Sequence, residues 1–130
     1  MVVDTSIVIA IMLQEAGSDS LISKINDADV RGISVVSYME ASMVLIARRG
    51  DGVEAELDRL LHEADIAILP VDEMQAKIAR EAFRVYGKGR HPAGLNFGDC
   101  FAYALAQSLS EPLFFKGDDF TQTDMLRVQE

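Results

Sequence analysis

Hydrophobic positions recur along this chain with two different spacings, and segments of the two kinds alternate. Val53, Leu57 and Leu61 fall at helical spacing and form one apolar face. Short apolar runs rich in β-branched residues, as in 32–36, are typical of buried strands. The pattern predicts strands over 2–3, 32–36, 66–71 and 113–115, with 126–128 as a candidate for a last one, and helices over 6–13, 18–28, 37–49, 52–64, 73–86 and 97–109.

Two of the predicted helices carry a further signal. Residues 6–13 are apolar on every side, which predicts a fully buried helix. Residues 73–86 are amphipathic, and we expect Ile78, Ala82, Phe83 and Tyr86 to face inward. Strands that alternate with helices predict an α/β fold, a three-layer sandwich in which helices cover both faces of a short central parallel sheet. Because no repeat or linker interrupts the pattern, we expect one domain over residues 1–130.

The composition is sufficient for a hydrophobic core of the usual size. Hydrophobic residues make up 49% of the sequence, and the single cysteine, Cys100, rules out a disulfide within the chain. The first basic residue is Lys24, so the start lacks the positive charge of a signal peptide. The apolar run 7–13 is too short to cross a bilayer. We therefore expect a cytoplasmic protein without a membrane partner.

The net charge of −9 argues against non-specific nucleic-acid binding, which relies on positive surface. Basic residues nevertheless gather between Lys77 and His91. The glycine-rich segment 87–94 is expected to be a loop that leads into the helix 97–109. The candidates for binding phosphate are Lys88, Arg90, His91 and Lys116.

Acidic residues recur at the ends of predicted strands. Asp4, Glu40 and the pair Asp118–Asp119 each follow a strand, and Asp99 lies near the start of the helix that leads into the strand 113–115. Sites in parallel sheets form beyond the carboxyl ends of the strands, so these side chains are expected to converge. Two carboxylates about 5 Å apart repel by roughly 3 kcal/mol at an effective dielectric constant near 20. A hard divalent cation, Mg²⁺ or Mn²⁺, offsets this repulsion, because both ions prefer oxygen ligands.

Each acid also has a structural explanation that needs no metal and no convergence. The explanations are an N-cap at Asp4, a capping box of Ser37 with Glu40, a cap at Asn96 with Asp99 favouring the helix dipole, and an ordinary turn at Asp118 and Asp119. If the carboxylates do converge on a metal, the metal polarises a phosphodiester and lowers the pKa of a bound water. Glu40, outside the ligand set, could then orient or deprotonate that water.

Several ordered segments resemble PIN-domain proteins, most closely the VapC-type toxins of bacterial toxin–antitoxin pairs. They are MVVDTS at 1–6, the helix that carries Glu40, GKGRHPAGLNFGDC at 87–100, and FKGDDF at 115–120 followed by Thr123 and Asp124. The resemblance covers essentially the whole chain. It implies a central parallel sheet, Mg²⁺- or Mn²⁺-dependent endoribonuclease activity, a homodimer, and inhibition by a cognate antitoxin protein.

The resemblance also implies roles for individual residues. By matching position, Asp4 and Asp99 are the principal metal ligands and Glu40 is a further acidic residue of the site. The hydroxyl of Thr5 or of Ser6 supports the site. Many relatives carry Thr-x-Asp after the last strand of the sheet, whereas this chain reads Lys-Gly-Asp-Asp at 116–119. The choice between Asp118 and Asp119 as the fourth acid therefore stays open.

Two other classes of function compete with a ribonuclease. A phosphoacceptor signalling domain also uses a parallel sheet and an acidic pocket, with a lone aspartate after the third strand, where Asp72 stands. That class expects paired acids after the first strand, and only Asp4 stands there. The second competitor is a catalytically inactive PIN-like module that keeps the fold for binding a protein.

Overall fold

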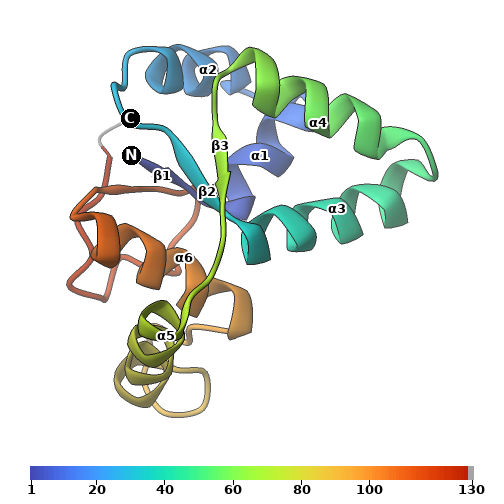
Figure 1. Ribbon diagram of the computed structural model, residues 1–130. Coiled ribbons are helices and arrows are strands. Elements are labelled where there is room, and N and C mark those ends of the chain that lie inside the picture. The colour runs from blue at the N-terminus through green and yellow to red at the C-terminus, as the bar shows by residue number, and fades with distance from the viewer. Residues whose placement is uncertain (129–130) are drawn as a thin grey trace.

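A parallel sheet between two groups of helices organises the chain, as the computed structural model shows for residues 1–128 (Figure 1). The strands are β1 (Val2–Val3), β2 (Gly32–Ser34), β3 (Ala67–Leu69) and β4 (Leu113–Phe114). Their order is β3-β2-β1-β4, and every neighbouring pair is parallel. Strands β2 and β3 thus lie on one side of β1, and β4 lies on the other. The direction in which strands are added to the sheet therefore reverses at β1.

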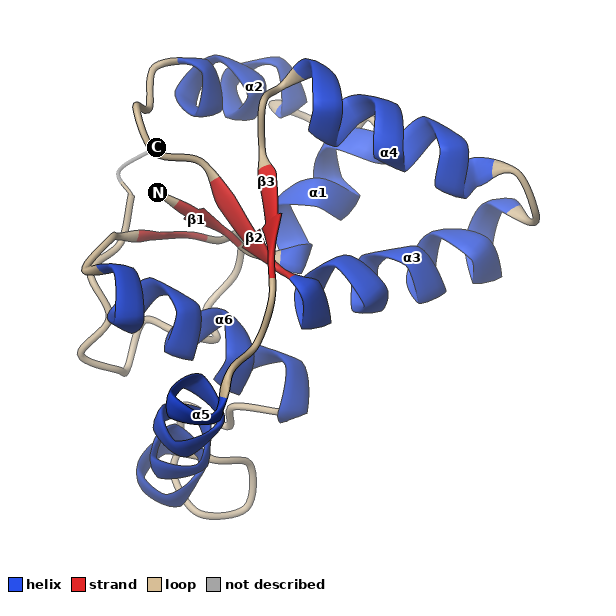
Figure 2. Cartoon of the chain, viewed as in Figure 1, coloured by secondary structure: helices blue, strands red, loops and turns tan. Residues whose placement is uncertain are grey.

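Six helices in the described residues cover the two faces of the sheet. They are α1 (Thr5–Met12), α2 (Ser18–Asn26), α3 (Val35–Arg49), α4 (Val53–Glu63), α5 (Glu73–Tyr86) and α6 (Phe97–Leu109). Helices α1 to α4 lie on one side of the sheet, and α5 and α6 lie on the other (Figure 2). The predicted three-layer α/β architecture is confirmed.

Two apolar clusters fill the space between the layers. One joins α1 to α4 with the sheet, and the other joins α5 and α6 with β4. Ile7 of α1 and Leu57 of α4 are fully buried in the first cluster, as their spacing predicts. Leu105 of α6 and Phe115 are buried in the second. Each such side chain contributes about 1.5–3 kcal/mol through its burial.

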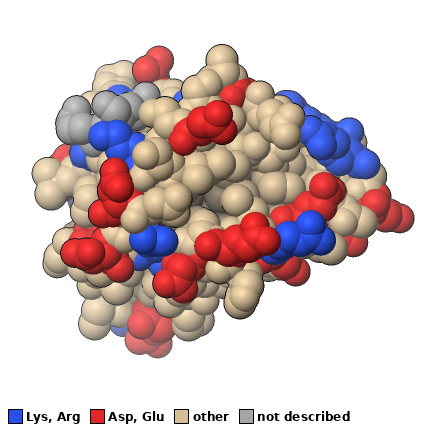
Figure 3. All heavy atoms as spheres, turned by 90° about the horizontal axis from the view of Figure 1, so that it is seen from above, with Lys and Arg blue, Asp and Glu red and all other residues tan. Residues whose placement is uncertain are grey.

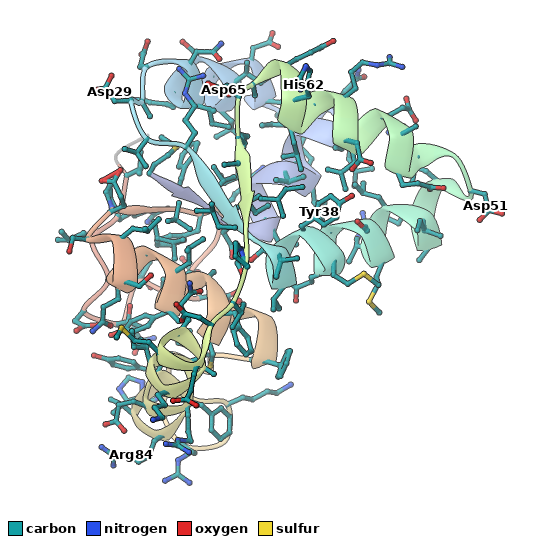
Figure 4. All side chains as sticks on the ribbon, in the orientation of Figure 1. Asp29, Tyr38, Asp51, His62, Asp65 and Arg84 are labelled. Carbon is teal, nitrogen blue, oxygen red and sulfur yellow. The ribbon has the colours of Figure 1, made fainter. Side chains whose placement is uncertain are left out.

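Helices α3 and α4 form a hairpin that projects from the sheet, with Asp51 at its tip (Figure 4). Tyr38 of α3 donates a hydrogen bond to Asp58 of α4 at 2.5 Å. This contact raises the pKa of Tyr38, because the carboxylate accepts the phenol proton and repels the phenolate charge. The bond ties the two arms of the hairpin together near its base.

The predicted boundary between the second strand and the following helix is wrong. The expected strand 32–36 ends at Ser34, whose side chain accepts a hydrogen bond from the Val36 N–H at 3.2 Å. Helix α3 therefore starts at Val35 instead of Ser37, and the predicted capping box of Ser37 with Glu40 is wrong. The β-branched Val35 and Val36 favour a strand locally, but the serine cap supplies a partner for an otherwise unpaired helix N–H. Glu40 is thus free of a capping role.

Other expectations differ from the structure in detail. Residues 126–128 form no strand; one bridge pairs Leu113 with Arg127, and β3 is shorter than the expected 66–71. Phe83, expected to face inward, is 43% exposed. The other three behave as predicted: Ala82 is buried, and Ile78 and Tyr86 are partly buried against the same cluster. Helix α5 also buries Gln75 and Ala79, and the small alanines let it pack closely on α6. No helix within residues 1–128 combines the length and the apolar character that crossing a membrane requires.

Candidate active site

Asp4 stands at the carboxyl end of the central strand and begins α1. Its Oδ2 accepts hydrogen bonds from the Ser6 N–H at 3.0 Å and the Ser6 hydroxyl at 2.6 Å, so the predicted N-cap is confirmed. The side chain is only 6% exposed, and its Oδ1 accepts no hydrogen bond from the described residues. Burial raises the pKa of Asp4, the bonds from Ser6 oppose this, and the charges of Glu40 and Asp119 raise it further.

The Ser6 hydroxyl joins the ends of two adjacent strands. Besides donating to Asp4, it accepts a hydrogen bond from the Lys116 N–H, just after β4, at 2.9 Å. Thr5 has a different partner, since its hydroxyl donates to the Ser37 carbonyl at 3.2 Å and so links α1 to α3. Of the two candidate hydroxyls, the one that touches the acid is therefore Ser6.

Asp99 lies in the first turn of α6 and belongs to a reciprocal cap. Its N–H donates to the Asn96 side chain at 2.9 Å, and its Oδ2 accepts from the Asn96 N–H at 3.0 Å. The side chain is 7% exposed. Burial raises the pKa of Asp99 from 3.8 to about 7; the Asn96 N–H opposes this shift, and the charges of Asp4, Asp119 and Glu40 add to it. Capping and convergence, which the sequence presents as alternatives, occur in the same side chain.

Glu40 reaches the same place from α3. Its half-buried carboxyl group lies against Gly98 of α6, where an added Cβ would stand 2.8 Å from Glu40 Cδ. Its charge contributes to the raised pKa of both Asp4 and Asp99. Sequence reasoning missed Gly98, although an isolated glycine inside a helical pattern is a signal of close packing.

The open choice after β4 is between two exposed neighbours in one turn. The charge of Asp119 raises the pKa of Asp4 and of Asp99, whereas Asp118 is among the causes of neither shift. The Asp118 carbonyl accepts hydrogen bonds from the Thr121 N–H at 3.1 Å and hydroxyl at 2.7 Å, which places it within an ordinary turn. Of the two, Asp119 is therefore the acid whose charge reaches Asp4 and Asp99.

The structure does not place the predicted phosphate-binding side chains among the acids. Within residues 1–128, no basic side chain contributes to the pKa shift of Asp4 or Asp99. Arg90 donates to the Arg84 carbonyl at 3.1 Å, at the lower tip of the molecule in Figure 4. His91 accepts a hydrogen bond from the Ala93 N–H at 3.0 Å, and Lys116 pairs with Glu15 at 2.8 Å. Lys88 is exposed.

The charge on the molecular surface does not supply the positive potential that the acidic cluster lacks. Figure 3 shows acidic side chains spread over one face of the molecule, with basic ones among them and one group of basic side chains at the upper right. This agrees with the net charge of −9. With this net charge, a locally bound cation would favour the binding of a polyanion.

The donor set at the centre consists of carboxylate oxygens, which suit a hard divalent cation. Among residues 1–128, no three His, Cys, Asp or Glu side chains are arranged to hold an ion by themselves, so a closed protein cage of the structural zinc type is excluded there. Mg²⁺ is ordinarily bound by one or two carboxylates and keeps several waters. Asp4 and Asp99 each have an Oδ1 without a hydrogen bond from the described residues, and no basic side chain of these residues is among the causes of their raised pKa values. The residues fit Mg²⁺ or Mn²⁺ held together with water.

Comparison with known proteins gives consistent results. The PIN domain family model matches residues 1–126. Ribonuclease VapC of Mycolicibacterium smegmatis is 48% identical over 128 residues, covering 98% of this chain and 99% of that protein. Ribonuclease VapC28 of Mycobacterium tuberculosis is 45% identical over 129 residues, covering 98% and 97%.

A solved structure supports the fold independently. The crystal structure of Mycobacterium tuberculosis VapC20, described as a Sarcin-Ricin loop cleaving toxin, superposes with a TM-score of 0.78 over 99% of this chain and 98% of that one. Its sequence identity of 15% makes this a likeness of fold. Since a family model spans nearly all of the sequence and relatives are close to half identical over their full length, this chain belongs to the PIN domain family.

Proposed function

We propose that this chain is a metal-dependent endoribonuclease, the toxin of a type II toxin–antitoxin pair, which cleaves RNA phosphodiester bonds with Mg²⁺ or Mn²⁺. The observation that carries the proposal is the meeting of Asp4, Glu40, Asp99 and Asp119, which come from four separate segments. Caps and turns require no such meeting, and the charges of the neighbouring acids add to the rise in pKa that burial causes at Asp4 and Asp99. The ribonuclease names of the full-length relatives support the same reaction.

The residues divide the work as follows. Asp4 and Asp99 would hold the metal, while hydrogen bonds from Ser6 and Asn96 keep their Oδ2 atoms in place. A divalent cation bound there would polarise the phosphodiester and lower the pKa of a bound water. Glu40 orients or deprotonates that water, and Asp119 adds negative charge at the open edge of the site.

The RNA backbone is bound by basic side chains at the rim. Lys116 is the best placed of them, because its own N–H is bonded to Ser6 beside Asp4. Its ammonium group pairs with Glu15 at 2.8 Å, and both side chains are more than 40% exposed, so a phosphate can replace that partner. Lys88, Arg90 and His91 contact phosphates farther along the RNA, since their loop leads into α6.

The protein partners are a cognate antitoxin and a second copy of this chain. Exposed apolar side chains on three neighbouring helices support a homodimer, since such a surface marks a protein contact. They are Met39 (56%) and Met43 (60%) on α3, Phe83 (43%) on α5, and Phe97 (73%) on α6. Phe83→Glu should shift the mass measured by light scattering from dimer to monomer. Met74→Glu, on the same helix but outside the hollows that Phe83 and Phe97 line, is the matched control.

RNA cleavage by neighbouring variants tests the proposed activity. Wild-type protein with Mn²⁺ should cleave RNA, EDTA should abolish this, and Asp99→Asn and Asp119→Asn should each lower the rate, on the order of 100-fold for Asp99. Asp118→Asn removes the same charge one residue away and should keep the wild-type rate. Cleavage that survives in Asp99→Asn would refute the site assignment, and a wild-type protein inactive with both metals would favour the non-catalytic module.

The signalling alternative finds no support in the position of its acceptor. Asp72 follows β3, the edge strand, and its side chain caps α5 by accepting the Gln75 N–H at 2.8 Å. It contributes to the pKa shift of neither Asp4 nor Asp99. Incubation with acetyl phosphate should therefore leave Asp72 unlabelled in a mass spectrum.

A further inference from the structure

Gly98 is the second residue of α6 and lies immediately before Asp99. It is buried, and an ideal Cβ at this position would stand 2.8 Å from both Cδ and Oε1 of Glu40 and still closer to Oε2. All three nearest atoms thus belong to the carboxyl group of one side chain from another helix. The Glu40 carboxyl group occupies the space that any side chain at position 98 would take.

The backbone gives no reason for a glycine here. Six of the nine glycines lie at positive φ, where a side chain is strained, but Gly98 has the ordinary backbone of a helix. Alanine is the better residue for a helix on conformational grounds. The close approach of Glu40 is therefore the feature of the structure that calls for glycine at this position.

We infer that Gly98 is a positioning residue: by lacking a side chain, it lets the Glu40 carboxyl group rest against the first turn of α6 beside Asp99. This inference deepens the proposed function and rests on it. Because the atoms in the way are the far end of a flexible side chain, a methyl group at position 98 displaces Glu40 without obstructing the backbone. Substitution should therefore affect the geometry of the acids much more than folding.

Gly98→Ala in the full chain tests the inference through activity and stability together. We expect the rate of RNA cleavage with Mn²⁺ to fall about tenfold or more, since a displacement of a catalytic group by 1 Å can lower a rate on the order of 100-fold. The thermal unfolding midpoint in EDTA should be unchanged or higher. Gln107→Ala, an exposed position at the other end of α6, is the matched control and should alter neither quantity.

A shorter acid at position 40 provides the rescue. Glu40→Asp withdraws the carboxyl group by one methylene and makes room for the new methyl group. The double variant Gly98→Ala/Glu40→Asp should therefore cleave RNA faster than Gly98→Ala alone, although Glu40→Asp by itself is slower than wild type. A wild-type cleavage rate in Gly98→Ala, or a double variant slower than both single variants, would overturn the inference.

A readout without RNA or metal separates this inference from the proposed function. The ¹³C chemical shift of the Glu40 carboxyl carbon, measured in EDTA, should move in Gly98→Ala and stay in place in Gln107→Ala. If wild-type protein cleaves no RNA but the shift moves, the proposed function fails and the positioning by Gly98 stands. If the shift does not move, the positioning role is refuted whatever the activity.

Discussion

Replacing Asp99 with asparagine removes a negative charge that lies close to other acidic side chains in the metal-free protein, and it keeps the helix cap. The asparagine carbonyl oxygen can accept the Asn96 N–H as Oδ2 does at 3.0 Å in the structure. What disappears is the cost of ionising a 7% exposed carboxyl group near Asp4, Glu40 and Asp119. The metal-free variant should therefore be more stable than wild type at neutral and higher pH.

The magnitude follows from the pKa of Asp99, which rises from 3.8 to about 7 on folding. At about 1.4 kcal/mol for each pKa unit, ionised Asp99 costs roughly 4 kcal/mol of unfolding free energy. Below pH 3.8 the carboxyl group is protonated in both states, and this cost is absent. As the pH rises through 7, the unfolded state releases its proton first, so the stability of wild type falls until the folded pKa is passed. The advantage of Asp99→Asn should thus grow from under about 1 kcal/mol at pH 4 to about 4 kcal/mol at pH 8.

Urea unfolding in EDTA, followed by far-UV circular dichroism because the chain has no tryptophan, measures this difference at both pH values. Asp118→Asn, an exposed acid in the turn after β4, is the control and should change stability by less than about 0.5 kcal/mol at either pH. Adding Mn²⁺ at 100 times its dissociation constant should stabilise wild type by about 2.7 kcal/mol and the Asp99 variant much less. An Asp99→Asn effect that is equal at pH 4 and pH 8 would refute the reasoning.

Three further predictions test other contacts. Ser6→Ala should lower the unfolding free energy by about 1–3 kcal/mol in urea titrations, because its hydroxyl hydrogen bonds to the ends of β1 and β4. Ser37→Ala should lower the unfolding free energy less than Ser42→Ala in the same assay. The buried Ser37 hydroxyl has no hydrogen-bond partner among residues 1–128, whereas the Ser42 hydroxyl donates to the Tyr38 carbonyl at 2.8 Å, a bond worth about 1 kcal/mol. Burial raises the pKa of the Cys100 thiol to about 11, so iodoacetamide at pH 8 should label folded protein far more slowly than urea-unfolded protein, and equal rates would contradict this.

Much of the architecture is predictable because the local spacing of hydrophobic residues indicates each helix and strand. The spacing of Val53, Leu57 and Leu61 predicts the buried face of α4, and the structure confirms it. Local signals also compete, and the sequence does not decide between them. Val35 and Val36 favour a strand, yet Ser34 caps a helix there, which moves the start of α3 by two residues.

The sequence alone determined the alternation of strands and helices, the three layers, and the presence of acids at strand ends. Asp4 and Asp99 could be singled out in this way, because a strand end and a helix start are both visible in the chain. It could not say that each would cap a helix with Oδ2 and leave Oδ1 available, since capping and metal binding appear in the sequence as alternatives.

Only the tertiary structure brings Asp119, and not Asp118, close enough for its charge to affect Asp4 and Asp99. It also places Glu40 against Gly98 and leaves the basic loop outside the acidic cluster. The physical reason is the same in each case. Local patterns record which way a backbone turns and which side of an element is buried, whereas these contacts join segments tens of residues apart. Their distances depend on the strand order β3-β2-β1-β4 and on how closely α3 and α6 pack, which no short stretch of sequence contains.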